Sequence, residues 1–207
     1  MQFKIHREGR LYFTLFLIIT IIILAFFPFL GLIFFILTGY IYYFFRDPIR
    51  IIPLDDLIVS PADGIVTFIG KSKPPVFLND DNANISNNDY IKISIFLNIF
   101  NVHVNRIPST GLIKKIKYIP GKFINATLNK SSTDNERNII ALEKDNKDII
   151  FITQIAGMIA RRIVCEIKEN QLINQGSRFG IIKFGSRVDL YLPNKYKVLV
   201  SLGQTVI

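Results

Sequence analysis

The sequence predicts a mainly β protein: a single antiparallel domain, barrel-like or sandwich-like, preceded by an N-terminal hydrophobic helical hairpin. Two observations lead to this prediction. Half of the 207 residues are hydrophobic, but they are concentrated near the N-terminus, where no charged residue occurs from Leu11 to Phe45. The rest of the chain contains short apolar runs, rich in β-branched residues and bounded by Gly, Pro, Asn or Asp, which are typical of strands.

The apolar segment is too long for one unbroken transmembrane helix. A helix over residues 11–45 would reach roughly 50 Å, whereas the hydrocarbon core of a bilayer is about 30 Å thick. Pro28 and Gly31 interrupt the segment, so we expect helices over about 11–27 and 32–45. Lysine and arginine flank both ends, which favours a hairpin or a re-entrant pair with both ends in the cytoplasm. A single tilted span is the competing interpretation, and a cleaved signal peptide is disfavoured by the length of the run.

A basic arm, residues 1–10, precedes the hairpin, and residues 46–207 are enough for one compact domain. Polar, asparagine-rich stretches at 71–89 and 125–138 are expected to be exposed loops. Five apolar runs in this domain are expected to be strands: residues 57–59, 65–69, 90–96, 149–153 and 197–200.

Charge and cysteine usage narrow the class of protein. The formal net charge is +9, but the basic residues are spread along the chain without a recognition helix or a base-stacking motif. We therefore expect contact with an anionic lipid surface and not with nucleic acid. Cys165 is the single cysteine, which excludes an intrachain disulfide and fits a reducing compartment, and we expect it in the core. One cysteine and two distant histidines do not predict a metal site.

A Gly-Ser bond near the C-terminus is suited to a specific reaction. Glycine lets the backbone of Gly185 bring the Ser186 hydroxyl onto the preceding carbonyl, which permits an N-to-O acyl shift. Elimination from the ester would cut the chain after Gly185 and leave a pyruvoyl group on residue 186. The ketone of that group can form a Schiff base with a substrate amine and accept the electrons released by decarboxylation, without pyridoxal phosphate. An isolated Gly-Ser pair is ordinarily a turn.

Two further motifs contain residues suited to proton transfer. Residues 60–64, Ser-Pro-Ala-Asp-Gly, have the composition of a turn and include Asp63. Residues 98–111 contain His103, which is the only histidine outside the N-terminal arm. Imidazole exchanges protons near neutral pH, so His103 is our candidate proton donor and acceptor.

Together these motifs resemble the phosphatidylserine decarboxylase proenzymes of the short, bacterial and archaeal type. The similarity is nearly continuous from Gly157 to Pro193. The resemblance implies self-cleavage into a β chain of residues 1–185 and an α chain of residues 186–207. It also implies that Ser186 becomes the pyruvoyl group and that the reaction needs no bound metal.

The resemblance extends to the other two motifs. It implies that Asp63 supports self-processing and that His103 transfers protons. The long-type enzymes have a second histidine three residues after the first, whereas this chain has Arg106 there. The base that activates Ser186 therefore stays open: His103 is one candidate, and it also suits the decarboxylation step.

The implied reaction converts phosphatidylserine in the membrane to phosphatidylethanolamine, in phospholipid biosynthesis at the cytoplasmic face of the cell membrane. A homo-oligomer is expected from the resemblance alone. Two alternatives are a membrane-anchored noncatalytic β module, such as a lipoyl-like carrier or a transport adaptor, and a pyruvoyl decarboxylase for another amino-acid headgroup. Candidate cations for the substrate phosphate or carboxylate are Arg161, Arg162, Arg178 and Arg187.

Overall fold

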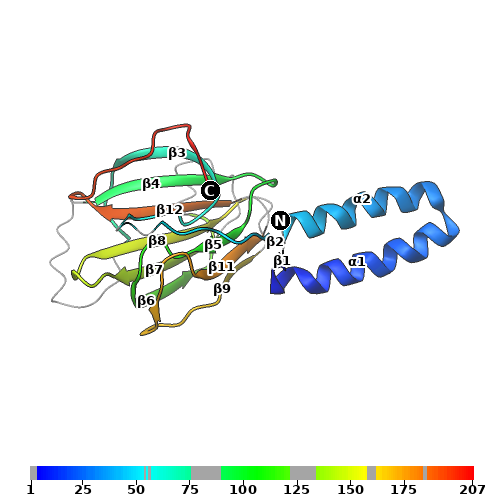
Figure 1. Ribbon diagram of the computed structural model, residues 1–207, viewed down its shortest axis with the longest axis horizontal. Coiled ribbons are helices and arrows are strands. Elements are labelled where there is room, and N and C mark those ends of the chain that lie inside the picture. Colours follow the sequence, from blue (N-terminus) through cyan, green and yellow to red (C-terminus); the bar gives the residue numbers. More distant parts are fainter. Residues whose placement is uncertain are drawn as a thin grey trace. The chain divides into compact units, whose positions relative to one another are not determined.

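The computed structural model describes most of the chain, which divides into two compact units, Met1–Ile51 and Ile52–Ile207 (Figure 1). The two stretches predicted as loops, 71–89 and 125–138, lie largely outside the described residues. Those described are 4–53, 55, 57–75, 90–121, 134–157, 162–183 and 186–207.

The first unit is a pair of packed helices, α1 (Arg7–Phe26) and α2 (Pro28–Phe44). Strand β1 (Lys4–Ile5), which precedes α1, pairs antiparallel with β2 (Arg46–Asp47), which follows α2. The hydroxyl oxygens of Thr20 and Thr38 lie 2.8 Å apart across the helix interface, so two polar side chains in an apolar pair satisfy each other. The predicted helical hairpin is therefore present.

The helix bounds differ from the expected ones for reasons of capping. Helix α1 begins at Arg7 because Nδ1 of His6 accepts a hydrogen bond of 3.3 Å from the backbone N–H of Glu8. Helix α2 begins at Pro28 and not at 32, since proline fits the first turn of a helix, and the break falls on Phe27. By length and composition α1 can cross a membrane, whereas α2 is apolar but shorter.

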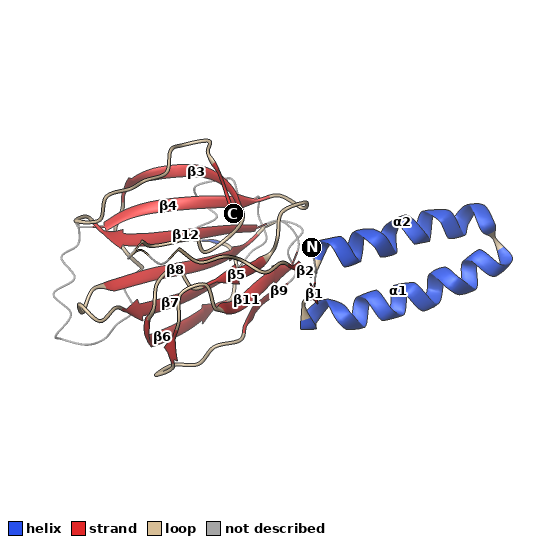
Figure 2. Cartoon of the chain, in the orientation of Figure 1, coloured by secondary structure: helices blue, strands red, loops and turns tan. Residues whose placement is uncertain are grey.

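The second unit is mainly β, as predicted, and consists of two packed sheets (Figure 2). The larger sheet is antiparallel, and its strands lie in the order β10-β6-β7-β8-β12-β4-β3-β13. Because this order is open among the described residues, the unit is sandwich-like and not a closed barrel. The bounds are β3 Gly64–Lys71, β4 Tyr90–Leu97, β6 Gly111–Ile119, β7 Arg137–Glu143, β8 Ile149–Ala156, β10 Leu172–Ile173, β12 Ser186–Pro193 and β13 Thr205–Val206.

The smaller sheet has three antiparallel strands in the order β5-β11-β9. Its apolar side chains join the same core as those of the large sheet: Ile163, Phe179 and Ile182 pack with residues of β7 and β8. Apolar burial between the sheets is the main stabilising contribution in such an arrangement. The bounds are β5 Val104–Arg106, β9 Arg162–Cys165 and β11 Arg178–Lys183.

The predicted strands at 65–69, 90–96 and 149–153 are confirmed as parts of β3, β4 and β8. The predictions at 57–59 and 197–200 are wrong, since neither segment belongs to a strand. Their apolar residues instead pack against the sheet face that carries the core, where Ile58, Val198 and Val200 contact the buried cluster. Burial of these short runs therefore comes from packing on a sheet and not from pairing within it.

Candidate active site

Ser186 is the first residue of β12, the strand that lies between β8 and β4. Its Cα pairs with Ala156 on one side and with Leu97 on the other. The residue is fully buried, and its Oγ has no hydrogen-bond partner among the described residues. A buried hydroxyl without a partner costs about 1–3 kcal/mol, so this side chain does not contribute to stability through a hydrogen bond. Gly185, the other half of the predicted cleavage site, lies outside the described residues.

His103 is fully buried, and a contact of its Nδ1 helps to orient the ring. Nδ1 lies 3.0 Å from the carbonyl oxygen of Asn101, so in the neutral ring Nδ1 carries the proton and Nε2 carries the lone pair. The backbone carbonyl of His103 accepts from the N–H of Ile182 at 3.4 Å. Ile182 precedes Ser186 by four residues, which places their Cα atoms within about 14 Å.

Asp63 lies in a bend that leads directly into β3. The bend is joined to the histidine segment, because the N–H of Arg106 donates to the carbonyl of Pro61 at 2.9 Å. At the start of β3, Ile65 pairs with Phe96 of β4, and the next residue, Leu97, pairs with Ser186. Gly64, the residue after Asp63, is thus about 10 Å from Ser186 across two strand spacings. The bend with Asp63 and the start of β12 therefore lie at the same end of the large sheet, and the histidine segment is hydrogen-bonded to Pro61 and to Ile182.

Sequence reasoning missed a chain of buried amides beside these motifs. Nδ2 of Asn138 donates to Oε1 of Gln154 at 3.0 Å, and Nε2 of Gln154 donates to Oδ1 of Asn105 at 2.9 Å. All three residues are buried, and Nδ2 of Asn105 has no partner among the described residues. Because Asn105 follows His103 by two residues in an extended segment, alternation was the one signal that placed both on the same side.

The side chain of Arg187 lies on the opposite face of β12 from Ser186. There Nε is 2.9 Å from Oδ1 of Asp189, and Nη2 donates to Oδ2 at 3.2 Å. Both side chains are almost completely buried, at 4% and 0% exposed. A buried pair of this kind depends on both partners, because removing one leaves an uncompensated charge. Arg187 is therefore held by an ion pair within β12, on the face away from Ser186.

The structure does not gather the remaining predicted cations at one place. Arg162 begins β9 and pairs with Lys183 on β11, at the end of β11 that precedes Ser186. Arg178 pairs with Arg106 at the other end of β11, about 17 Å away along the strand. Arg161 lies outside the described residues.

Cys165 packs against the main core, as predicted. Burial raises the pKa of its thiol, although hydrogen bonds to the backbone of Ile167 and to Asn138 act in the opposite direction. A raised pKa reduces the thiolate fraction and so disfavours a nucleophilic role. Within the described ranges, no group of three or more His, Cys, Asp and Glu side chains is arranged to hold a metal ion.

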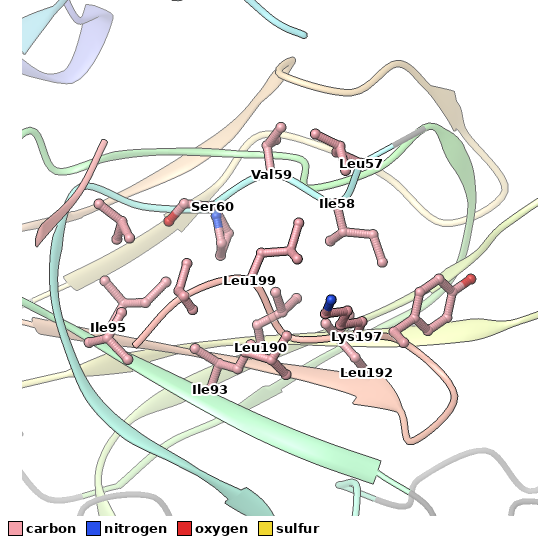
Figure 3. Close-up of a pocket in the computed structure, with 16 residues that line it drawn as sticks. Leu57, Ile58, Val59, Ser60, Ile93, Ile95, Leu190, Leu192, Lys197 and Leu199 are labelled. Carbon is pink, nitrogen blue, oxygen red and sulfur yellow. The ribbon is translucent and has the colours of Figure 1, made fainter. Parts of the chain in front are cut away.

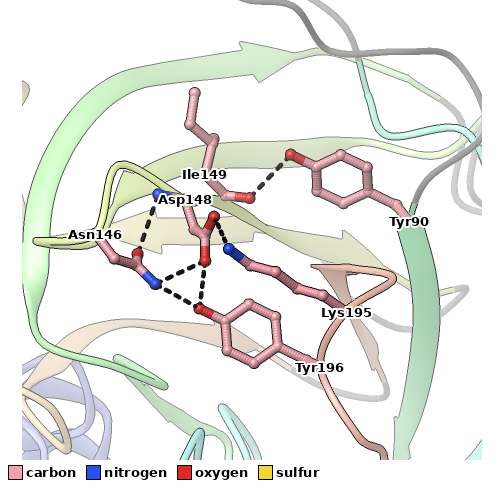
Figure 4. A network of polar contacts seen from close by, with 6 residues as sticks. All are labelled: Tyr90, Asn146, Asp148, Ile149, Lys195 and Tyr196. Carbon is pink, nitrogen blue, oxygen red and sulfur yellow. Dashed lines mark hydrogen bonds and ion pairs between the residues drawn. The ribbon is translucent and has the colours of Figure 1, made fainter.

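The turn after β12 is tied to the β7–β8 hairpin by a polar network (Figure 4). Asp148 accepts from the Lys195 ammonium at 2.7 Å and from the Tyr196 hydroxyl at 2.6 Å. Burial alone would raise the pKa of Asp148, but these hydrogen bonds outweigh it and lower the pKa below its usual value. The Tyr90 hydroxyl donates to the carbonyl of Ile149 at 3.0 Å, and burial followed by the charge of Asp148 raises its pKa to about 12.

Comparison with known proteins gives one consistent family. The family model described as phosphatidylserine decarboxylase matches residues 37–207. The phosphatidylserine decarboxylase proenzyme of Rickettsia akari is 50% identical over 204 residues, which cover 98% of this chain and 86% of the relative. The proenzymes of Rickettsia prowazekii and Rickettsia bellii are 49% and 48% identical over the same lengths.

Proposed function

The chain belongs to the phosphatidylserine decarboxylase family, and we propose that it cuts itself between Gly185 and Ser186 and then decarboxylates phosphatidylserine to phosphatidylethanolamine. It is an enzyme of the carboxy-lyase type. The observation that supports the self-cleavage best is the Ser186 hydroxyl, which is fully buried without a hydrogen-bond partner among the described residues. A pyruvoyl group formed at this residue would remove that hydroxyl.

The proposed cleavage uses atoms of the chain and one water molecule. The Ser186 oxygen adds to the carbonyl carbon of Gly185, the peptide C–N bond breaks, and the nitrogen takes up the hydroxyl proton. Loss of the α-proton of residue 186 then breaks the Cβ–O bond and releases the Gly185 carboxylate. Water hydrolyses the resulting dehydroalanine and ammonia leaves. The pyruvoyl group supplies an electron-accepting ketone for decarboxylation.

His103 is the proposed proton carrier. Since Nδ1 faces the carbonyl of Asn101, the lone pair of the neutral ring is at Nε2, where it can accept a proton and return it. Asp63 is the proposed support for self-processing, because its bend is hydrogen-bonded to the segment that carries His103. Arg162 is the predicted cation that lies at the cleavage end of β11, where it is opposite Lys183.

Asn105 is proposed to donate its free N–H to the oxygen that becomes negatively charged during the acyl shift. Asn105→Asp keeps an oxygen that can accept from Gln154 but replaces the donor with a second oxygen, and it places a carboxyl group where the side chain is fully buried. We expect self-cleavage to slow by about 100-fold, the usual cost of losing one oxyanion donor, and Tm to fall because a carboxyl group is buried. Cleavage time courses and thermal unfolding measure the two effects. Asn138→Ala, which removes the far end of the amide network, is the destabilised control: it should lower Tm but leave self-cleavage near the parental rate. Cleavage of Asn105→Asp at the parental rate would exclude the donor role.

The membrane arrangement is also a proposal. Helix α1 is long and apolar enough to cross a bilayer, and α2 is apolar but shorter. With basic residues flanking both, we propose that the pair is held in the membrane and that the β unit works at the cytoplasmic face on anionic lipid. The β and α chains of one precursor stay together, and a homo-oligomer is expected from the family alone.

A headgroup panel tests the substrate. The purified full chain and its Ser186→Ala variant are each incubated with vesicles that contain phosphatidylserine, phosphatidylthreonine or no aminophospholipid. Free serine is tested in a separate sample. We expect carbon dioxide and phosphatidylethanolamine only from phosphatidylserine with the parent, at least 100-fold faster than with the variant. Turnover of another headgroup and not of phosphatidylserine would show that the proposed substrate is wrong. A cleaved chain that acts on none of them would contradict the proposed activity.

A further inference from the structure

An apolar pocket of about 280 Å³ lies on the core-facing side of the large sheet (Figure 3). Its floor is made of buried side chains of β3, β4, β12 and β13. Its walls are two segments, 57–61 and 196–200, which contain the runs 57–59 and 197–200 that were predicted as strands. Figure 3 shows Leu57 and Val59 on one side, Ile93 and Leu192 on the other, and Leu199 between them.

The lining offers almost nothing to a polar ligand. The Ser60 hydroxyl donates to the carbonyl of Ala62 at 2.6 Å, and the Tyr196 hydroxyl is bonded to Asp148. Lys197 is exposed, so its aliphatic stem can line the pocket while its ammonium group stays in water. The other lining side chains are aliphatic. A sugar or a nucleotide would lose its hydrogen bonds here, whereas a hydrocarbon chain would lose none.

The pocket is connected to the proposed reaction site through one of its walls and through β12. Wall 57–61 leads directly to Asp63 and is bonded to the histidine segment twice, through Val59 N–H to the Pro108 carbonyl and Arg106 N–H to the Pro61 carbonyl, each at 2.9 Å. The floor residue Leu190 shares the face of β12 with Ser186 and lies about 13 Å along the strand. The glycerol and phosphate of an extended phospholipid can bridge that distance.

We propose that this pocket binds one acyl chain of the phospholipid substrate while its headgroup is held at Ser186. This inference rests on the proposed function for the identity of the headgroup. If a methylene group takes about the volume of a water molecule, roughly 30 Å³, the pocket accommodates roughly nine of them. Because wall 196–200 and floor residues Leu190 and Leu192 belong to the α chain, the acyl chain would be held by both products of the cut.

The binding test uses the uncleaved Ser186→Ala protein, full length, in phosphatidylcholine vesicles. A trace of phosphatidylserine with a diazirine near the end of one acyl chain is photoactivated, and cross-linked peptides are mapped by mass spectrometry. We expect labels in 57–61 and 196–200, besides those that the bilayer gives in the helices. Excess unlabelled phosphatidylserine should suppress the pocket labels about tenfold. Label in the helices only would overturn the proposal, as would equal labelling by a phosphatidylcholine or free fatty acid probe.

Two exposed leucines provide a matched pair. Leu199 is 66% exposed and lines the pocket, whereas Leu202 is 69% exposed and does not. Leu199→Asp in the Ser186→Ala protein should reduce pocket labelling about tenfold, and Leu202→Asp should leave it unchanged. Equal labelling of both variants would contradict an acyl site.

Chain length gives a kinetic readout in the cleaved enzyme. With monomeric short-chain phosphatidylserines, each added methylene should lower KM about fourfold until the pocket is full near nine carbons. A KM independent of chain length would contradict the inference. Because photolabelling needs neither cleavage nor turnover, an inactive protein that still labels in the pocket would count against the proposed function alone.

Discussion

Ser186→Ala is expected to yield a single uncleaved chain of 23.8 kDa. The methyl group that replaces the hydroxyl cannot add to the Gly185 carbonyl, so neither the cut nor the electron-accepting ketone can form. The parent should give two fragments divided after Gly185. The smaller fragment, residues 186–207, should be lighter by the mass of one ammonia than the same peptide with an N-terminal serine. In it the Cα of residue 186 is a ketone carbon and the Cβ is a methyl group. Intact-protein mass spectrometry of both proteins, expressed with membranes, measures this directly.

Decarboxylation by the Ser186→Ala protein should fall to the background of membranes that lack the protein. Ser201→Ala is the matched control, because Ser201 is an exposed serine of the same C-terminal fragment and should leave cleavage intact. A Ser186→Ala protein that is cut at this position, or that decarboxylates as fast as the parent, would refute the proposed chemistry. An uncut parent would favour the noncatalytic membrane module.

His103→Gln is expected to lower the rate of at least one proton-dependent step by about 100-fold or more, the usual contribution of a general acid or base. The glutamine amide can make hydrogen bonds but cannot carry a proton near neutral pH. Cleavage and decarboxylation should be followed separately. An uncut variant would assign His103 to the activation of Ser186, whereas a cut but inactive variant would assign it to decarboxylation.

The second histidine provides the control for this experiment. His6 caps α1 through Nδ1 and lies in the other unit, so His6→Gln should leave both rates within about twofold. A His103→Gln protein that is cut and active at parental rates would exclude His103 as the proton carrier.

The hydrophobic pattern of the sequence predicted the helical hairpin and three of the strands. The apolar run at the N-terminus predicts a hairpin, since burial of many consecutive apolar residues requires helix in lipid and proline marks the break. Alternation of apolar and polar residues in 90–96 predicts β4, because successive side chains of a strand point to opposite faces of the sheet. The run 197–200 misleads because four apolar residues have the same composition in a strand as in a segment packed across a sheet.

The candidate site could also be predicted only in part. Ser186 can be identified in the sequence because it follows a glycine, and His103 because it is the only histidine outside the N-terminal arm. The role of Asn105 is invisible there, since its amide is oriented by Gln154, which is 49 residues away and lies on another sheet. The ion pair between Arg187 and Asp189 could not be predicted either. A sequence shows two opposite charges, but not that both side chains are buried.

The place of β12 between β8 and β4 has a consequence for the life of the enzyme. Before the cut, an unfolded chain carries its own central strand and refolds as one molecule. After the proposed cut, residues 186–207 would be held by two ladders of hydrogen bonds and by Lys195 and Tyr196 on Asp148, but the unfolded fragment would have no covalent link to the rest of the protein. Refolding would then be a second-order encounter between two peptides, whose rate falls with dilution. We therefore expect the unfolded precursor to refold more readily than the cleaved protein.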